Sequence, residues 1–205
     1  MRRIQNLMEQ WLFIGPDNRQ EQVNLPHTWN AKDGQDGGND YYRGTCHYEK
    51  TFEKPEFDPE AEEVYLEFLG VNASSDVTVI GKELAHHDGG YSTFRINITE
   101  VLEDRNKLEV TVDNSVNGKV YTQKADFTFY GGIYRDVRFL IVSKEHFDLD
   151  YLGSNGIKIT PEVKENEANV HIETFTNTEE AQVKSDTNII FPASSTGLTP
   201  TVNKS

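Results

Sequence analysis

The sequence contains 205 residues, of which 20 are Lys or Arg and 34 are Asp or Glu, giving a formal net charge of −14. This acidic excess argues against binding to nucleic acid or to an anionic membrane surface, because both need clustered basic side chains. No run approaches the ~18 apolar residues of a membrane span. The first ten residues lack the apolar core of a signal peptide, so we expect a cytoplasmic protein.

The apolar pattern along the chain is typical of strands. Runs rich in apolar and β-branched residues alternate or cluster over short stretches, and turns rich in Gly, Asp and Asn separate them. One stretch, 99–106, begins with a Thr cap and acidic residues and is predicted as a short helix. Many short strands with almost no helix predict an all-β fold, an antiparallel β-sandwich or jelly roll. The predicted strands span residues 64–69, 76–80, 108–112, 137–142, 156–160, 168–175 and 188–191.

The composition changes near residue 143. Both Trp, both Met and the only Cys lie before this point, and the last residues are rich in Ser, Thr and Pro. We therefore predict a first domain over 1–142 and a second unit over 143–205. The second unit has too few predicted strands for a complete immunoglobulin-type sandwich, which needs about seven. We expect the chain to be part of a longer protein.

Several residues that could carry chemistry have simpler interpretations. The sequence has no nucleophile elbow, P-loop or dinucleotide fingerprint. Acidic residues in the loop 33–40 miss the alternate positions of an EF-hand, so we interpret the loop as a glycine turn. His86 and His87 are interpreted as part of a polar turn, because adjacent residues on an extended chain face opposite ways. Cys46 is predicted to be a buried thiol, and as the only cysteine it excludes an internal disulfide.

Two segments combine aromatic side chains with carboxylates, amides and guanidinium groups. The first is LPHTWN at 25–30, followed by the glycine-rich loop and YYRG at 41–44; the second is ADFTFYGGIYRDV at 125–137. Sugar recognition uses such groups, because rings stack on pyranose faces while Asp, Asn and Arg bond to hydroxyls. The alternative is that these aromatic clusters only close the core of the sandwich.

Four motifs carry a resemblance to a known family. LPHTWN, GGNDYYRG, HHDGGYSTF and ADFTFYGGIYRDV follow one another in the order and spacing of the N-terminal domain of glycoside hydrolase family two. The sequence is most similar to the bacterial β-galactosidases of that family, over residues 10 to 142. Ile80 stands where the family usually has Asn. Residues from 143 onward resemble the start of the family's immunoglobulin-like second domain more loosely.

The resemblance implies a fold and indicates which domain of the family carries the catalytic residues. The fold is a galactose-binding-like jelly roll followed by a partial immunoglobulin-like sandwich. In this family a TIM barrel carries the two glutamates of a retaining β-glycosidase. The barrel motifs do not occur in this sequence. We therefore assign no catalytic residue and expect the 205-residue chain alone to be inactive.

The resemblance also assigns roles to individual residues. Asp126 is expected to bind hydroxyls of the terminal sugar and to help ligate Na⁺, and Asn39 to approach the same sugar. No cofactor is required by this chain, although Mg²⁺ is expected in the full enzyme. Arg135 and Asp136 are predicted to form a structural ion pair. Trp29 and Tyr42 are predicted to belong to the core or to a domain interface.

The leading hypothesis is the non-catalytic N-terminal part of a retaining β-galactosidase. Its expected partners are a β-galactoside sugar and the missing barrel domain, without nucleic acid or membrane, and homo-oligomer formation stays open. One alternative is a stand-alone carbohydrate-binding module. Another is a β-glucuronidase or β-mannosidase of the same family. The last is a truncated or frameshifted gene product without activity.

Overall fold

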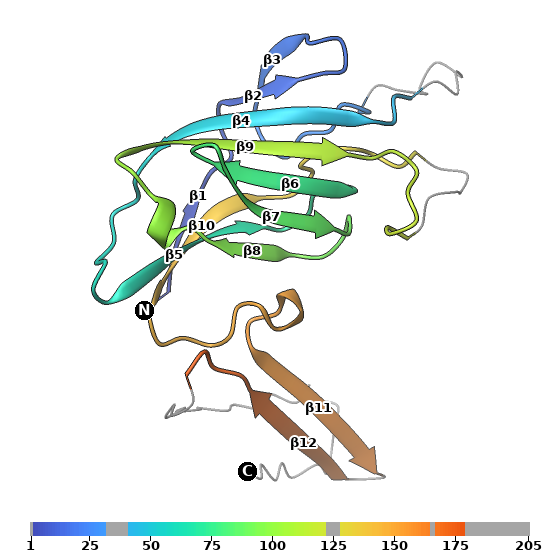
Figure 1. The fold of residues 1–205 in the computed structure, drawn as a ribbon. Coiled ribbons are helices and arrows are strands. Elements are labelled where there is room, and N and C mark those ends of the chain that lie inside the picture. Colours follow the sequence, from blue (N-terminus) through green and yellow to red (C-terminus); the bar gives the residue numbers. More distant parts are fainter. Residues whose placement is uncertain (1, 32–40, 122–127, 165–166, 179–205) are drawn as a thin grey trace, which may run out of the picture. The chain divides into compact units, whose positions relative to one another are not determined.

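The computed structural model describes residues 2–31, 41–121, 128–164 and 167–178. The chain divides into two compact units, Met1–Lys144 and Glu145–Ser205. Within the described residues the chain is built from short strands, with two 3₁₀ helices of three residues each (Figure 1). The all-β prediction is therefore confirmed. No helix in the described ranges is long and apolar enough to cross a membrane.

The first unit is a sandwich of two antiparallel sheets. One sheet has four strands in the order β1-β10-β5-β8, and the other has six in the order β3-β2-β4-β9-β6-β7. The order of the strands within the two sheets agrees with the predicted jelly-roll sandwich. The four-stranded sheet contains β1 (Arg3–Asn6), β5 (Glu62–Phe68), β8 (Phe94–Asn97) and β10 (Val137–Ser143). The six-stranded sheet contains β2 (Trp11–Ile14), β3 (Gln20–Val23), β4 (Thr45–Glu53), β6 (Ser74–Val79), β7 (Lys82–Asp88) and β9 (Arg105–Asp113).

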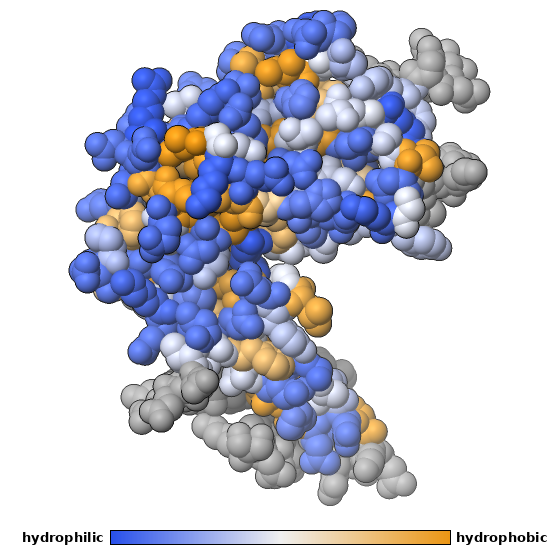
Figure 2. All heavy atoms as spheres, viewed as in Figure 1, coloured by the Kyte–Doolittle hydropathy of each residue, from blue (hydrophilic) through white to orange (hydrophobic). Residues whose placement is uncertain are grey.

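The hydrophobic core lies between the two sheets. Along β9, Leu108, Val110 and Val112 are buried while their neighbours are more exposed, as the two-residue period of a strand requires. On the four-stranded sheet, the buried Phe68 ring stacks on Phe94 with ring centroids 4.8 Å apart. Polar residues cover most of the face of the molecule that Figure 2 shows. Burial alternates along β9 of the six-stranded sheet, whereas β5 and β10 of the four-stranded sheet are buried over most of their length.

Cys46 confirms the prediction of a buried thiol. It lies on β4 and has no exposed surface. Burial raises the pKa of its thiol to about 12, because the charged thiolate would lose its hydration. The thiol is therefore protonated at neutral pH and does not act as a nucleophile.

The predicted helix over 99–106 is wrong. Only Thr99–Val101 forms a 3₁₀ turn, and β9 begins at Arg105. The Thr99 hydroxyl accepts a hydrogen bond from the backbone N–H of Val64 at 2.9 Å, which ties the turn to β5. Arg105 and Asn106, which the pattern assigned to a second helical turn, instead pair with β4 as part of β9. Tertiary pairing has overridden a local capping signal.

The second unit contains a single described hairpin. β11 (Ile157–Lys164) pairs with β12 (Glu167–Thr174) in antiparallel register. Before the hairpin, the 3₁₀ helix Tyr151–Gly153 places the Tyr151 ring 3.9 Å from Phe175, stacked upon it. These two strands confirm the predicted strands at 156–160 and 168–175. The one predicted at 188–191 lies outside the described residues, and the immunoglobulin-like assignment stays a prediction.

Candidate functional site

Both sequence-predicted site residues lie outside the described residues. Asn39 falls within 32–40 and Asp126 within 122–127, and the glycine turn at 33–40 falls there too. The structure does show how the chain on either side of these two loops is held. The candidate site is therefore built from the flanking residues.

A pair of asparagines with no exposed surface lies at the base of the two loops. Asn114 follows the end of β9, and its Nδ2 donates to Oδ1 of Asn30 at 3.2 Å and to the carbonyl of Phe129 at 3.0 Å. The same Oδ1 of Asn30 accepts the backbone N–H of Gly131 at 2.8 Å. Both asparagine side chains are fully buried. The chain before the first loop is thus joined to the chain after the second.

The remaining amide atoms of this pair hold the far side of the first loop. Nδ2 of Asn30 donates to the carbonyl of Tyr42 at 2.9 Å. Oδ1 of Asn114 accepts the backbone N–H of Gly44 at 2.8 Å, and its backbone carbonyl accepts Nε of Arg43 at 3.0 Å. The Asn30–Asn114 pair therefore bonds to the chain on both sides of the first loop and to the chain after the second. Such a satisfied buried network fixes the geometry of the segments that it joins.

Aromatic packing closes the space around the asparagine pair. The Trp29 ring stacks on Phe13, with centroids 6.1 Å apart, and packs against the hydrophobic core. Gly131 lies so close that an added Cβ would be 2.1 Å from Trp29. Tyr42, by contrast, is 37% exposed. Trp29 thus belongs to the core side of the site and Tyr42 to its surface.

The remainder of the first motif is also structural. The backbone N–H of His27 donates to the carbonyl of Ile133 at 2.8 Å, and Nδ1 of its ring lies 2.8 Å from the hydroxyl of buried Tyr48. Burial lowers the pKa of His27, because the charged imidazolium would lose its hydration. The backbone of His27 therefore joins the two segments, while its ring bonds to Tyr48 on β4.

The motif around Gly90 packs against the second segment. The Tyr134 hydroxyl donates to the carbonyl of Gly90, and Nδ2 of Asn72 donates to the carbonyl of Tyr130 at 2.7 Å. A Cβ on Gly90 would lie 2.2 Å from Oδ1 of Asn72. The lack of a side chain at Gly90 thus leaves room for the Asn72 side chain.

The predicted ion pair between Arg135 and Asp136 is wrong. Arg135 lies over the Tyr134 ring, with Cζ 5.3 Å from its centroid, and Nη1 points to the carbonyls of Leu69 and Tyr91 at 3.5 Å. No ion pair of Asp136 occurs among the described residues. The Arg135 guanidinium is instead directed to the Tyr134 ring and to backbone carbonyls.

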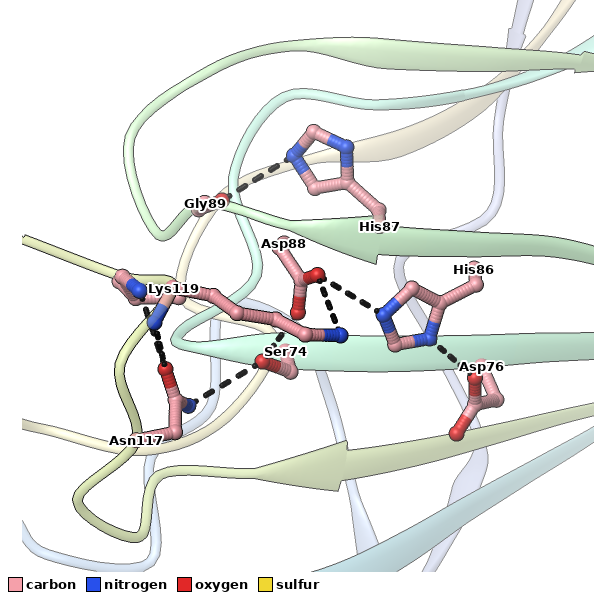
Figure 3. A network of polar contacts seen from close by, with 9 residues as sticks. Ser74, Asp76, His86, His87, Asp88, Gly89, Asn117 and Lys119 are labelled. Carbon is pink, nitrogen blue, oxygen red and sulfur yellow. Dashed lines mark hydrogen bonds and ion pairs between the residues drawn. The ribbon is translucent and has the colours of Figure 1, made fainter.

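His86 and His87 lie on β7 and not in a turn, and they face opposite ways as predicted (Figure 3). Nδ1 of His86 is 2.6 Å from Asp76, and Nε2 is 3.0 Å from Asp88. Hydrogen bonds to Asp76 and then to Asp88 raise the pKa of His86, while burial lowers that of His87, which stacks on Phe94. No group of three or more His, Cys, Asp or Glu that could hold a metal occurs in the described ranges.

Asp88 connects β7 to the segment that leads into the second loop. Its carboxylate accepts the Ser74 hydroxyl at 2.7 Å and lies 3.0 Å from Nζ of Lys119. Nδ2 of Asn117 donates to the Ser74 hydroxyl at 3.4 Å (Figure 3). The hydrogen bond from Ser74, followed by those from Lys119 and His86, lowers the pKa of Asp88 to about 2. This exposed charged network is a second anchor for the segment 114–121.

Tyrosine rings also remain available on the surface of the first unit. Tyr91, Tyr121 and Tyr130 are 63%, 88% and 46% exposed. Tyr91 and Tyr130 belong to the two motifs that pack against each other through Gly90, and Tyr121 directly precedes the second loop. Exposed aromatic rings beside polar loops suit contact with a sugar or with another protein surface.

The family of the chain follows from comparison with known proteins. A family model described as glycosyl hydrolase 2 galactose-binding domain-like matches residues 38–149, which is more than half of the chain. The chain belongs to this family. The match includes the end of the first loop from residue 38, the second loop, Asn114 and the described residues from 128 to 149, whereas Asn30 lies before it. It agrees with the sandwich fold of the first unit.

Named relatives include two kinds of glycosidase. A Bacteroides fragilis protein named β-glucuronidase is 39% identical over 69% of this chain and 20% of its own length. A Thermoanaerobacter pseudethanolicus protein named β-galactosidase is 29% identical over 71% of the chain and 22% of its own length. The crystal structure of an FMN-binding β-glucuronidase from Facaelibacterium prausnitzii L2-6 matches with a TM-score of 0.79 and 42% identity, over 86% of this chain and 28% of that one. The chain thus spans less than a third of the length of these relatives.

Sequence reasoning missed the Asn30–Asn114 pair. Asn30 is the last residue of the LPHTWN motif, and none of the four motifs includes Asn114. The available signal was the position of Asn114 immediately after the alternating buried residues of β9. A polar residue at the end of such a strand must find a hydrogen-bond partner if it is buried.

Proposed function

We propose that this chain is the sugar-binding part of a retaining β-glycosidase that removes a terminal sugar. The catalytic glutamates would be supplied by a barrel domain that these 205 residues do not contain. The observation that carries the proposal is the shared anchor in a chain of this family: one buried asparagine pair bonds to described residues that flank both predicted sugar-binding loops. Flanking segments joined in this way support the proposal that Asn39 and Asp126 act on one ligand.

The proposed sugar is a terminal β-glucuronide, with a β-galactoside as the second candidate. The relative named β-glucuronidase shares 39% identity, against 29% for the one named β-galactosidase over a similar share of the chain. The sequence motifs alone favoured the β-galactoside. In this proposal the barrel completes the sugar pocket. Residues outside this chain would therefore make most of the contacts with the substrate.

A panel of nitrophenyl glycosides tests the proposal. The polypeptide encoded by the whole reading frame that contains this chain is expected to hydrolyse the β-glucuronide faster than the β-galactoside or β-mannoside. The first sugar released should keep the β configuration, which NMR of the early product detects. A faster β-galactoside reaction would overturn the choice of sugar. Hydrolysis of none of these substrates would overturn the proposed function.

Asp126 and Asn39 are the proposed sugar contacts of this chain. A carboxylate accepts two hydroxyl hydrogen bonds and can hold a hard cation such as Na⁺. Replacement Asp126→Asn is expected to lower kcat/KM about tenfold to a hundredfold, the equivalent of losing a hydrogen bond to a charged group. Na⁺ should raise kcat/KM of the unchanged enzyme and not of this variant. Equal kcat/KM values for the two proteins would contradict the role of Asp126.

A stand-alone carbohydrate-binding module is the alternative function. The exposed rings of Tyr91, Tyr121 and Tyr130 favour it, because a sugar can stack on them without a barrel. Calorimetry of the 205-residue chain with glucuronate, galactose and lactose separates the two functions. We expect no measurable heat, since the pocket lacks its other half. Millimolar or tighter binding would favour the module.

A further inference from the structure

We propose that Asn117 is a site of spontaneous deamidation in the folded protein. The sequence contains two Asn-Gly pairs, Asn117–Gly118 and Asn155–Gly156. Glycine after asparagine leaves the following backbone nitrogen open to approach, because it has no Cβ. The two pairs differ at the glycine, and only the first leaves the attacking backbone nitrogen accessible.

Gly118 presents its backbone nitrogen without obstruction. It is exposed, and an added Cβ would meet no atom within 4 Å. Its N–H forms no hydrogen bond within the part of the chain that the structure describes. No other group therefore competes with the Asn117 side chain for this nitrogen.

The side-chain carbonyl of Asn117 is held in a polarising position. Its Oδ1 accepts the backbone N–H groups of Lys119 at 2.9 Å and Val120 at 3.0 Å. Two donors on one carbonyl oxygen stabilise the negative charge that develops there when a nucleophile adds to the carbon. The contacts that shape this turn therefore also favour attack on the Asn117 amide.

The reaction needs only water. The Gly118 nitrogen loses its proton and bonds to Cγ of Asn117. The bond from Cγ to the side-chain nitrogen then breaks and ammonia leaves. The product is a five-membered succinimide ring. Water then opens either carbonyl of the ring. One opening gives an aspartate at position 117 and the other gives an isoaspartate, whose backbone runs through the former side chain. No oxidation or reduction takes place.

The second Asn-Gly pair shows the opposite surroundings. Gly156 is buried, its N–H donates to the Ser154 hydroxyl at 3.1 Å, and its carbonyl accepts the N–H of Phe175 at 2.8 Å. A succinimide at Asn155 would break the first of these bonds. The second pair is therefore a control within the same molecule.

Deamidation would change the exposed charged network (Figure 3). A carboxylate at position 117 can still accept from Lys119 and Val120, but it cannot donate to Ser74 as the amide does at 3.4 Å. It also adds a negative charge near Asp88, and the isoaspartate product lengthens the backbone of segment 114–121. The reaction would thus loosen the anchor that precedes the second loop.

Peptide mapping by mass spectrometry tests the proposal on the full 205-residue chain. Folded protein is incubated at mildly alkaline pH. The mass increase that accompanies replacement of the side-chain NH₂ by OH is then followed at both Asn-Gly pairs. Asn117 should convert at least about tenfold faster than Asn155, because one hydrogen bond on the nucleophile is worth about that factor. In urea-unfolded protein the two rates should be similar.

A matched variant tests the chemistry. Gly118→Ala adds a methyl group where there is space and where no positive φ is needed, so the fold should be unchanged while the methyl hinders attack. Conversion at Asn117 should slow severalfold. An unchanged rate in this variant would overturn the succinimide route. Protection of Asn117 in the folded chain, or equal rates at both pairs, would overturn the assignment of the site.

Discussion

Two polar networks in the first unit hold the segment 114–121, one through buried neutral hydrogen bonds and the other through exposed charges. The Asn30–Asn114 pair is neutral and fully buried, and bonds mainly to backbone groups. The network of His86, Asp76, Asp88 and Lys119 is charged and largely exposed. Water cannot replace a lost hydrogen-bond partner in the buried asparagine pair, but it can do so in the exposed charged network. We therefore expect burial to decide the energetic weight of each network more than charge does.

Removal of Asn114 is expected to have the largest effect. Asn114→Ala removes the acceptor of the Gly44 N–H and one donor to the Phe129 carbonyl, and it opens a cavity. The free energy of unfolding should fall by about 3 kcal/mol or more. Urea unfolding followed by Trp fluorescence measures this change in the first unit, which contains both tryptophans. A loss below about 1 kcal/mol would contradict the weight given to the buried network.

Filling the space beside the buried pair is expected to have the next largest effect. Gly131→Ala would place a Cβ 2.1 Å from Trp29, and the strain should lower the free energy of unfolding by about 1–3 kcal/mol. Gly118→Ala, which meets no neighbour, is the matched control and should change it little. Equal unfolding midpoints for the two variants would show that the site can relax around Trp29.

Ser75 offers a third case, a buried polar group. Among the described residues no group forms a hydrogen bond with its hydroxyl, although only 2% of the residue is exposed. Ser75→Ala should therefore raise the free energy of unfolding by about 1 kcal/mol. Ser74→Ala is the control, since this hydroxyl does donate to Asp88 and its loss should destabilise slightly. Destabilisation by Ser75→Ala would show that the hydroxyl has a partner in solution.

The exposed network should give the smallest effect, and one that depends on pH. Because the pKa of His86 is raised in the folded protein, its stabilising contribution is present below the ordinary histidine pKa of about 6.5 and is lost as pH rises through the folded pKa. The difference in unfolding free energy between the unchanged chain and His86→Gln should therefore shrink as pH rises. His27 and His87, whose pKa values are lowered, act in the opposite direction but are common to both proteins.

Lys119→Ala provides the pH-independent comparison within the same network. An exposed ion pair contributes about 0–1 kcal/mol, so this variant should be nearly neutral over the same pH range. A difference between the unchanged chain and His86→Gln that grew with pH would mean that Asp76 and Asp88 do not hold the imidazolium.

The alternating pattern predicted strands such as β9, where Leu108, Val110 and Val112 are buried, and the apolar run at 137–142 predicted the mostly buried strand β10. The helix over 99–106 was predicted wrongly, since capping residues report local preference and not pairing with a distant strand. The Asn30–Asn114 contact joins residues 84 positions apart. No local pattern encodes such a contact, so the anchor of the candidate site required the structure. Asn39 and Asp126 remain predictions of the family resemblance.

The central structural claim is that one buried amide pair anchors the segments beside both loops as a unit. Amide hydrogen exchange of Gly44 and Gly131, measured by NMR, tests it most directly. Gly44 donates to Asn114, and Gly131 donates to Asn30. We predict that Asn30→Ala and Asn114→Ala each accelerate exchange at both glycines. Acceleration only at the glycine that lost its own acceptor would contradict the claim.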